Sequence, residues 1–526
     1  MGIYVNPKNE SFRTSLNSFI YVDKSLIVRE LNKVVDTNQK YICVSRPRRF
    51  GKSMAKRLLV SYYSKGCDSH ELFKDLKISK EPTYEKYLNK FNVVSIDFND
   101  FVTNLYNIGE DSLIKAMNRK VSEEFPEEFP EIDFSKCQNI ADCIKEVYKR
   151  TGIKFVILMD EYDLIVRSEP PKAILREYLD FLITLFKSEA TNDATALAYI
   201  TGILPIVREK VESKLNNFDE ITFLKPYNFV DFTGFTEDEV KELCETHDIN
   251  FQECLHWYDG YGINGKRICN PEAIVKAVTR RDFDCYWSAT GSYETVSPYI
   301  KSNYQGIKDD LITMLAGGSV PVFIQSFTNS PDHINSKDTL FTYLMHIGFL
   351  AYDDRRKRCR IPNLETLSIW RTIITQADGF AKLGEFICNS ERLYNATIDG
   401  DSDTVASTLE DLHDYATSNL SYNHEQSLQT VINFAYIYAR TNYTLFNELP
   451  TGKGYADVVF VPFYPNYPAM IVELKRNSST DSAINQIKAR NYSQHLAHYK
   501  GKLLFVGINY DDNKGHQCKM EWFEME

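Results

Sequence analysis

The sequence predicts an α/β protein of several domains, and three observations lead to this class. The chain has 526 residues, which is more than a single hydrophobic core usually supports. In its first part, short apolar runs alternate with helical stretches, which is typical of a parallel sheet with helices on both faces. In its last part, a second series of strands surrounds one long helix. The expected strands are 41–44, 93–96, 155–159 and 196–200 in the first part, and 443–447, 456–461, 469–474 and 503–508 in the last.

These patterns divide the chain into three regions, 1–235, 236–370 and 380–526. The first region contains the strands of the expected parallel sheet, and the last contains the second series. The helices expected between strands are 111–124 and 172–188 in the first region and 480–498 in the last.

The middle region is expected to be mainly helical. It opens with Thr236 and Glu239, which can form a capping box, because each side chain can accept a hydrogen bond from the other residue's backbone N–H. Near its end, apolar runs at 347–352 and 359–361 flank a charged stretch, and this pattern predicts a hairpin. Helices followed by a hairpin would suit a winged-helix module.

Composition favours a protein of the cytoplasm. The formal net charge is −11, which argues against an overall basic surface but leaves room for a local basic groove. Eleven scattered cysteines without a C-x-x-C pair fit reduced thiols better than disulfides or a zinc site. The N-terminus lacks a signal-peptide pattern, and no apolar run approaches the roughly 20 residues of a membrane span.

A candidate phosphate-binding loop follows the first strand. Gly51, Lys52 and Ser53 form the second half of the pattern G-x-x-x-x-G-K-[ST], in which backbone N–H groups and the lysine hold phosphates and the hydroxyl binds Mg²⁺. Arg46 stands where the first glycine belongs, and it brings a Cβ that glycine lacks. The remaining candidates for nucleotide contacts are Arg48, Arg49 and Phe50. The basic cluster can equally be a solvated face.

The strand 155–159 ends in a pair of carboxylates that complements this loop. Asp160 is expected to meet Mg²⁺ together with Ser53, and Glu161 to polarise the attacking water. An acidic turn after a buried strand is common by itself, but both pieces in this order favour nucleotide binding. Thr201, after the strand 196–200, is a further candidate for sensing the terminal phosphate.

A second candidate active centre lies in the C-terminal region. Side chains alternate along a strand, so Glu473 and Lys475 share one face, and Asp457 on the preceding strand can face the same pocket. Two carboxylates can hold Mg²⁺ at a scissile phosphate, and a lysine can orient the attacking water. Glu-x-Lys alone is common as a solvated edge, but here it follows the apolar run 469–472. Further candidates are Gln486, Tyr492 and Glu425, of which Glu425 can equally be a surface residue.

With these residues assembled, the chain resembles a bacterial family in which an AAA-like P-loop ATPase domain is fused to a PD-(D/E)XK nuclease domain. The resemblance covers nearly the whole chain. The segments that carry it are 21–25, 46–53, 159–163, 234–239, 286–291, 361–365, 454–457 and 473–475.

The resemblance implies roles for the candidate residues. Lys52 and Ser53 would contact ATP phosphates and Mg²⁺, and Asp160 and Glu161 would form the Walker B pair. Asp457, Glu473 and Lys475 would form the centre of a restriction-endonuclease-like domain, flanked by Gln486. The residues 164–168, Leu-Ile-Val-Arg-Ser, depart from the pattern. No arginine finger is evident, although Arg208 is a candidate, and homo-oligomers stay open.

Our leading hypothesis is a Mg²⁺-dependent nuclease, acting on DNA in preference to RNA, whose cleavage is controlled by ATP. A setting in defence or mobile-element biology is context taken from the resemblance. The rival is a nucleotide-switched protein that binds nucleic acid or protein without cutting. A third reading, a nuclease with a purely structural ATPase domain, is open because the phosphate loop is atypical.

Overall fold

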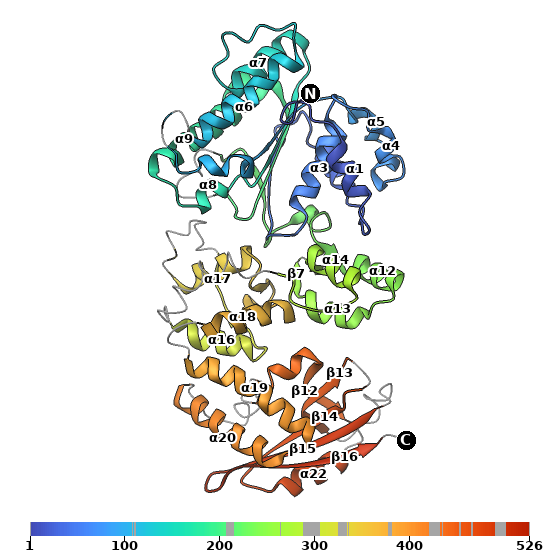
Figure 1. The fold of residues 1–526 in the computed structure, drawn as a ribbon, viewed down its shortest axis with the longest axis vertical. Coiled ribbons are helices and arrows are strands. Elements are labelled where there is room, and N and C mark those ends of the chain that lie inside the picture. The colour runs from blue at the N-terminus through green and yellow to red at the C-terminus, as the bar shows by residue number, and fades with distance from the viewer. Residues whose placement is uncertain are drawn as a thin grey trace. The chain divides into compact units, whose positions relative to one another are not determined.

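The computed structural model describes most of the chain (Figure 1). The described residues are 2–107, 109, 112–206, 215–263, 265–287, 306–324, 334, 336–376, 381–419, 432–433, 435–451, 454–463, 466–489 and 501–524. They form two compact units. The first comprises Met1–His247, Gly260–Thr279 and Val322–Lys357, and the second comprises Asp248–Asp259, Arg280–Pro321 and Arg358–Glu526. The three-region division with its boundaries at 235 and 370–380 stays a prediction.

The first unit is built on a five-stranded parallel sheet. Its order is β2-β3-β4-β1-β5, and every neighbouring pair is parallel. The four strands predicted for this region are confirmed, and β5 is an addition that the apolar pattern did not indicate. The strands are β1 (Tyr41–Ser45), β2 (Asn92–Asp97), β3 (Phe155–Asp160), β4 (Thr195–Gly202) and β5 (Asp219–Ile221).

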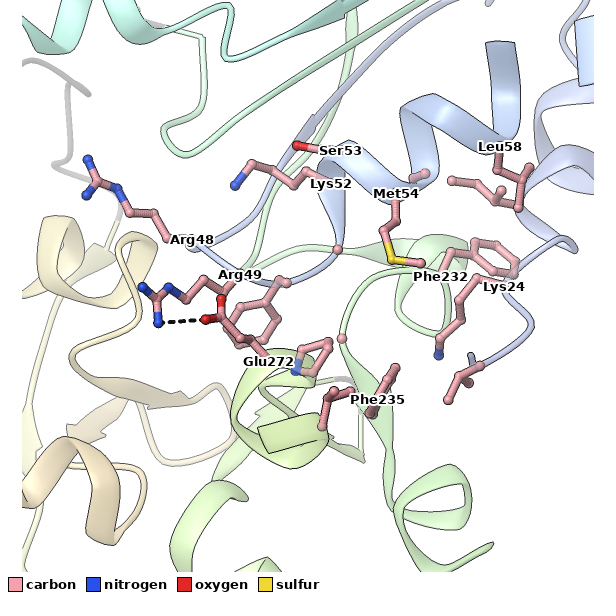
Figure 2. Close-up of a pocket in the computed structure, with 18 of the residues that line it drawn as sticks. Lys24, Arg48, Arg49, Lys52, Ser53, Met54, Leu58, Phe232, Phe235 and Glu272 are labelled. Atoms are coloured by element: carbon pink, nitrogen blue, oxygen red, sulfur yellow. Dashed lines mark ion pairs between the residues drawn. The ribbon is translucent and has the colours of Figure 1, made fainter. Parts of the chain in front are cut away.

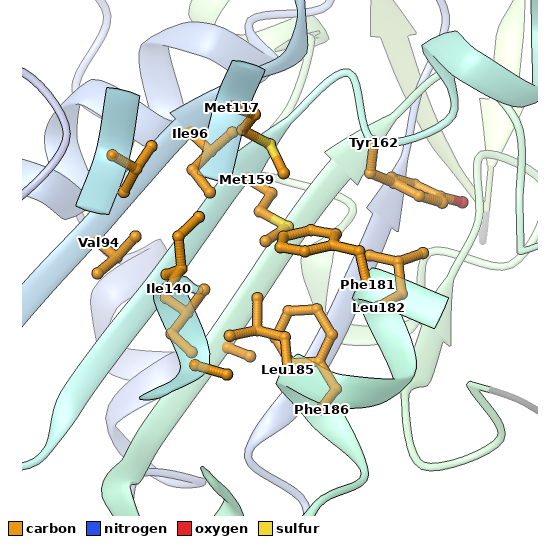
Figure 3. Packing of buried hydrophobic residues seen from close by; sticks show 14 of the residues in the cluster. Val94, Ile96, Met117, Ile140, Met159, Tyr162, Phe181, Leu182, Leu185 and Phe186 are labelled. Atoms are coloured by element: carbon orange, nitrogen blue, oxygen red, sulfur yellow. The ribbon is translucent and has the colours of Figure 1, made fainter. Parts of the chain in front are cut away.

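Helices cover both faces of this sheet because successive residues of its strands point to opposite sides. Val94 and Ile157 enter one buried cluster, with helices α6, α7 and α9 (Figure 3). Their neighbours Val93 and Val156 enter the other, with helix α3. The helices of this part are α1 (Glu10–Leu16), α2 (Ile27–Asn32), α3 (Lys52–Tyr63), α4 (His70–Phe73), α5 (Tyr84–Tyr87), α6 (Leu113–Glu128), α7 (Ile140–Thr151), α8 (Leu164–Arg167), α9 (Lys172–Phe186) and α10 (Glu189–Ala194).

The middle of the chain is mainly helical, as predicted. The capping box is confirmed: the Thr236 N–H donates to Glu239 Oε2 at 2.8 Å, and the Glu239 N–H donates to Thr236 Oγ1 at 3.4 Å. Strands occur on both sides of the charged stretch 354–357, and the winged-helix module stays a prediction. The helices are α12 (Glu237–His247), α13 (Phe251–Tyr258), α14 (Pro271–Arg280), α16 (Ile307–Leu315), α17 (Lys337–His346) and α18 (Leu364–Gln376). The strands are β6 (Phe235–Thr236), β7 (Tyr261–Ile263), β8 (Lys266–Cys269), β9 (Val320–Pro321), β10 (Ala351–Asp353) and β11 (Arg358–Arg360).

The C-terminal part contains a mixed sheet in the order β12-β13-β14-β15-β16, in which β14 and β15 are parallel. Helix α22 connects this parallel pair and packs on β15 at Gly507. A Cβ at Gly507 would lie 2.9 Å from Thr480 O and 3.1 Å from Ala483 Cβ, so glycine allows the close approach. All four predicted strands are confirmed. The elements are α19 (Ala381–Asp399), α20 (Ser402–Asn419), β12 (Tyr443–Thr451), β13 (Gly454–Pro462), β14 (Ala469–Arg476), α22 (Thr480–Ala489), β15 (Lys502–Asp511) and β16 (Gly515–Glu524).

Candidate functional site

The loop between β1 and α3 has the shape of a phosphate-binding loop (Figure 2). Gly51 is the N-cap of α3 and has φ +85°, a conformation that other residues adopt only with strain. No atom lies within 4 Å of a Cβ placed there, so the backbone conformation and not the space requires glycine. The turn leaves the N-terminal N–H groups of a 12-residue helix directed at the loop, where an anion is stabilised.

Lys52 is almost completely buried, with 4% of its side chain exposed. Its Nζ donates to the carbonyl oxygens of Arg46 and Pro47, each at 3.1 Å, and lies 3.9 Å from Glu161 Oε1. Burial lowers the pKa of Lys52, and the Glu161 carboxylate opposes that shift. The ammonium group is therefore held inside the loop, next to the carboxylate that follows β3.

The three arginines of the loop have different surroundings. Arg46 is buried, and its guanidinium donates to Thr233 Oγ1 at 2.7 Å and to the carbonyl oxygens of Ser45 and Ile221 at 2.8 and 3.0 Å. Arg46 supports the loop from the interior, away from the position expected for a phosphate contact. Arg48 and Arg49 line the adjoining cavity, and Arg49 forms a 3.0 Å ion pair with Glu272 of α14, shown by the dashed line in Figure 2.

Phe50 combines two roles in the structure. Its ring is fully buried and packs edge-on against Phe223 and Tyr261, with ring centroids 5.3 and 5.5 Å apart. It also contributes to the wall of the cavity. Phe50 therefore mainly anchors the loop. Its contact with a nucleotide stays a prediction.

Three polar side chains end neighbouring strands of the parallel sheet beside this loop. Asp160 of β3 pairs with Thr201 of β4, and Ser45 of β1 pairs with Gly202. Asp160 Oδ2, Thr201 Oγ1 and Ser45 Oγ are all buried and have no hydrogen-bond partner. Side chains alternate along a strand, so Asp160 and Thr201 lie on the α3 face of the sheet, like Leu158 and Tyr199, whereas Ser45 lies on the opposite face, like Cys43. Buried polar atoms are normally satisfied, so Asp160 Oδ2 and Thr201 Oγ1 fit a site that receives a polar ligand. Carboxylate and hydroxyl oxygens are suited to a hydrated Mg²⁺ ion.

Asp160 is also close to a second cation. Lys56, four residues after Lys52 on α3, places its Nζ 3.9 Å from Asp160 Oδ2 and 3.0 Å from Asp97 Oδ2. Asp97 ends β2 and is paired with Asp160 across the two strands. Lys56 and Asp97 were not predicted as site residues from the sequence, although the i+4 spacing from Lys52 places both lysines on one face of α3.

Glu161 is held by charged neighbours. Its backbone has φ +54°, an uncommon conformation for glutamate. Arg167 Nη2 contacts Glu161 Oε2, while Lys52 lies on the side of Oε1. Burial raises the pKa of Glu161, and the positive charges of Lys52 and Arg167 oppose that rise. The arrangement suits a carboxylate that orients water in a partly desolvated place.

A cavity of about 560 Å³ adjoins the loop. This volume lies within the range usual for sites that take small molecules and cofactors. One part of its wall is charged and polar and includes Lys52, Ser53, Glu161 and Arg167. The rest is largely apolar. Its apolar lining residues are Phe12, Ile20, Val22, Ile27, Phe50, Met54, Ala55, Leu58, Leu164, Phe232, Phe235, Pro271 and Val275.

The second centre lies on β14 and α22. Glu473 is 1% exposed, and its Oε1 accepts a hydrogen bond from Lys475 Nζ at 3.0 Å and another from Gln486 Nε2. Glu473 and Lys475 are two residues apart on one strand, and Gln486 reaches the same oxygen from the following helix. The three predicted side chains are therefore brought together as the sequence analysis expected.

Asp457 belongs to β13, next to this cluster in the sheet. Val458 of β13 is paired with Val472 of the antiparallel strand β14. Asp457 directly precedes Val458 and Glu473 directly follows Val472, so the two residues are adjacent to this pair on the same side. The side chain of Asp457 lies outside the described part of the structure. Glu425, Tyr492 and Arg208 also lie outside the described residues.

Two further findings concern the described residues. Among them, no group of three or more histidine, cysteine, aspartate or glutamate side chains is arranged to hold a metal ion. None of the helices in the described ranges is long and apolar enough to cross a membrane.

The geometry defines a protein with an ATPase-like parallel sheet and a separate mixed sheet with a charged centre. Residues 10–212 match the family model described as "Predicted AAA-ATPase", and residues 423–520 match the model described as "PD-(D/E)XK nuclease superfamily". The chain thus combines an N-terminal predicted AAA-ATPase domain with a C-terminal domain of the PD-(D/E)XK nuclease superfamily.

Two individual proteins are similar to parts of the chain. An uncharacterized protein in the vnfD 5′ region of Azotobacter chroococcum mcd 1 is 26% identical over an alignment of 291 residues, and the match covers 52% of this chain and 51% of that protein. The chain therefore spans about half the length of this curated relative. The structure of the Aeropyrum pernix ORC2 protein (ADPNP-ADP complexes) matches 68% of this chain and 96% of its own, with 10% identity and a TM-score of 0.31.

Proposed function

We propose that this protein is a Mg²⁺-dependent nuclease, acting on DNA in preference to RNA, whose cleavage is controlled by ATP binding and hydrolysis in the N-terminal domain. The proposal rests on one observation: Lys475 and Gln486 both donate hydrogen bonds to Oε1 of the buried Glu473. A carboxylate with 1% exposure needs partners and a reason to be retained, and phosphodiester hydrolysis supplies that reason.

The nuclease residues would divide the work as follows. Asp457 and Glu473 would hold Mg²⁺. The bound ion would neutralise charge on the scissile phosphate. Lys475 would orient the attacking water and offset the negative charge that develops in the transition state. Gln486 fixes the Glu473 carboxylate by its hydrogen bond to Oε1.

The phosphate loop and cavity support ATP as the controlling ligand. Lys52 would exchange its two loop carbonyl contacts for phosphate oxygens, and Arg48 and Arg49 would add positive charge at the cavity wall. Ser53 and Asp160 would hold the Mg²⁺ that accompanies the nucleotide, and the buried Thr201 hydroxyl would contact the terminal phosphate. The apolar part of the wall would take the base and ribose.

The cytoplasm is the compartment that we propose for this activity. All eleven cysteines are thiols, and six of them are buried. Free thiols persist where the surroundings are reducing.

The rival function is a nucleotide-switched module that binds nucleic acid or protein without cleavage. The paired Glu473 and Lys475 argue against it, because binding alone does not require a buried carboxylate held by a lysine and a glutamine.

The decisive experiment measures cleavage of linear, circular and single-stranded DNA, and of RNA, with Mg²⁺ in the presence and absence of ATP. Glu473→Gln keeps the shape of the side chain and removes its charge, and Lys475→Met removes the ammonium group. Lys514→Met, at an exposed lysine of the same domain, is the matched control. We expect cleavage by the wild type and the control, none by the two site variants, and a change in rate with ATP. If no substrate is cut under any condition, the binding function replaces this proposal.

A further inference from the structure

A continuous series of charged contacts links the phosphate loop to the end of β4. It begins at Lys52, whose Nζ lies 3.9 Å from Glu161 Oε1. Glu161 Oε2 contacts Arg167 Nη2, and Arg167 Nε donates to Asp163 Oδ2 at 2.8 Å. Arg167 lines the same cavity as Lys52 and Ser53, and only 12% of its side chain is exposed.

Asp163 anchors this series to the sheet. Its carboxylate accepts hydrogen bonds from the backbone N–H groups of Ile203 at 3.1 Å and Leu204 at 2.8 Å, directly after β4 ends at Gly202. Asp163 is 1% exposed. A Cβ at Gly202 would lie 2.3 Å from Asp163 Oδ1, so this contact requires glycine. The guanidinium of Arg167 is therefore fixed on one side by a buried carboxylate that cannot turn away.

Because the Arg167 guanidinium is fixed by Asp163, it restricts the position of its second partner, Glu161. Arginine presents its donors in a planar fork, so a guanidinium held through Nε has few ways to place Nη2. Glu161 is thus located by Arg167 from one side while its unusual backbone conformation is maintained. When Lys52 engages a phosphate, Arg167 would be the charged contact that keeps Glu161 in place.

We propose that Arg167 is the positioning residue for Glu161 in ATP hydrolysis, and that the Asp163–Arg167 pair fixes the Walker B carboxylate relative to the end of β4. This inference rests on the proposed ATP-binding function. In the step concerned, the water oxygen bonds to the terminal phosphorus and the bond to the bridging oxygen breaks, with its electron pair leaving on ADP. Glu161 accepts the proton of the attacking water.

A different role for the same side chain would be direct contact with the terminal phosphate, since Arg167 lines the cavity. The two roles make opposite predictions. A phosphate contact contributes to ATP affinity, or to the rate independently of Glu161, whereas a positioning residue contributes to the rate of hydrolysis only through Glu161.

A double-mutant cycle on the full chain separates these roles. Glu161→Gln, Arg167→Gln and the double variant are compared with the wild type, with Arg176→Gln, an exposed arginine on α9, as the matched control. For each protein, the ATP dissociation constant is measured by titration calorimetry and kcat by phosphate release. Arg167→Lys restores the charge without the fork and tests rescue.

We expect Glu161→Gln to lower kcat by on the order of a hundredfold or more, as removal of a general base does. Arg167→Gln should lower kcat at least roughly tenfold while ATP affinity stays within about twofold, and Arg167→Lys should recover part of the rate. The double variant should hydrolyse ATP no more slowly than Glu161→Gln alone, because both changes disable one unit.

Several outcomes overturn the inference. These are a tenfold loss of ATP affinity with unchanged kcat in Arg167→Gln, multiplicative losses of rate in the double variant, and a wild type that binds ATP without hydrolysing it. If Arg167→Gln does not fold, the comparison of Arg167→Lys in the wild-type and Glu161→Gln backgrounds gives the same cycle. A wild type that binds no ATP in the titration is a different failure, since it removes the nucleotide half of the proposed function itself.

Discussion

Replacement of Gly202 by alanine tests the close packing at the end of β4. The added Cβ would lie 2.3 Å from Asp163 Oδ1 and 2.8 Å from an edge carbon of the Tyr162 ring. Neither group can move without loss, because Asp163 accepts three hydrogen bonds, from Ile203, Leu204 and Arg167. The Tyr162 hydroxyl is likewise fixed, donating to the Leu204 carbonyl at 2.7 Å.

The size of the effect follows from these contacts. Inserting one methyl group into a packed interior costs about 1–3 kcal/mol of unfolding free energy. Losing one buried hydrogen bond of Asp163 leaves a donor unsatisfied, which costs about 1–3 kcal/mol. We expect Gly202→Ala to destabilise the N-terminal unit by about 2–6 kcal/mol in total. In a domain of this size, each kcal/mol lowers Tm by roughly 2–4 °C.

The assay must report on the N-terminal unit. All four tryptophans lie at position 257 or later, so intrinsic tryptophan fluorescence is unsuitable, and scanning calorimetry is the method of choice. Gly262→Ala is the control, because no atom lies within 4 Å of a Cβ at Gly262. An unfolding free energy of Gly202→Ala within about 0.5 kcal/mol of the control would refute the argument that Asp163 is rigidly held.

Three further predictions concern the two candidate sites and the pH dependence of stability. Lys52→Met should weaken ATP binding at least roughly tenfold in titration calorimetry, because the buried ammonium would be the central phosphate ligand in the proposed ATP site, and unchanged binding would contradict that role. Gln486→Ala should lower the rate of DNA cleavage more than the affinity for DNA, measured by anisotropy, because it fixes the Glu473 carboxylate without a substrate contact; equal losses would indicate a binding role. Burial lowers the pKa of His256 to about 4, below its ordinary value in the unfolded chain, so the unfolded state gains protons first as the pH falls. The free energy of unfolding should therefore decrease from pH 6.5 towards pH 4, by about 2 kcal/mol at pH 5. The His256→Gln variant can still donate to the Arg440 carbonyl and should show a smaller decrease, measured by denaturant titrations at each pH.

Much of the fold was predictable because it depends on local pattern. Buried parallel strands read as continuous apolar runs, and those at 41–44 and 155–159 were located to within one residue of the structure. The capping box at Thr236 was predictable for the same reason, since its two partners are three residues apart. β5 (Asp219–Ile221) was not predicted, because a three-residue strand with a charged beginning carries no such pattern.

The candidate sites were predictable where chemistry and spacing coincide. Glu473 and Lys475 share a face because side chains alternate along a strand, and the structure joins them through a 3.0 Å hydrogen bond. Arg46 shows the limit of this reasoning. Its position in the loop suggested a phosphate contact, but its partners Thr233 and Ile221 are far away in the sequence, so its burial was not evident there.

The sequence by itself determined the order of the main strands and helices, the loop at Gly51–Ser53, the Asp160–Glu161 pair and the Glu473–Lys475 pair, because each depends on residues that are neighbours along the chain. The tertiary structure alone decided which charges meet. Arg167 lies six residues after Glu161 on a short helix, and its orientation depends on Asp163, whose carboxylate is held by backbone N–H groups some forty residues further on. Such contacts arise when β4 is placed between β1 and β3, and no local pattern of residues encodes that placement.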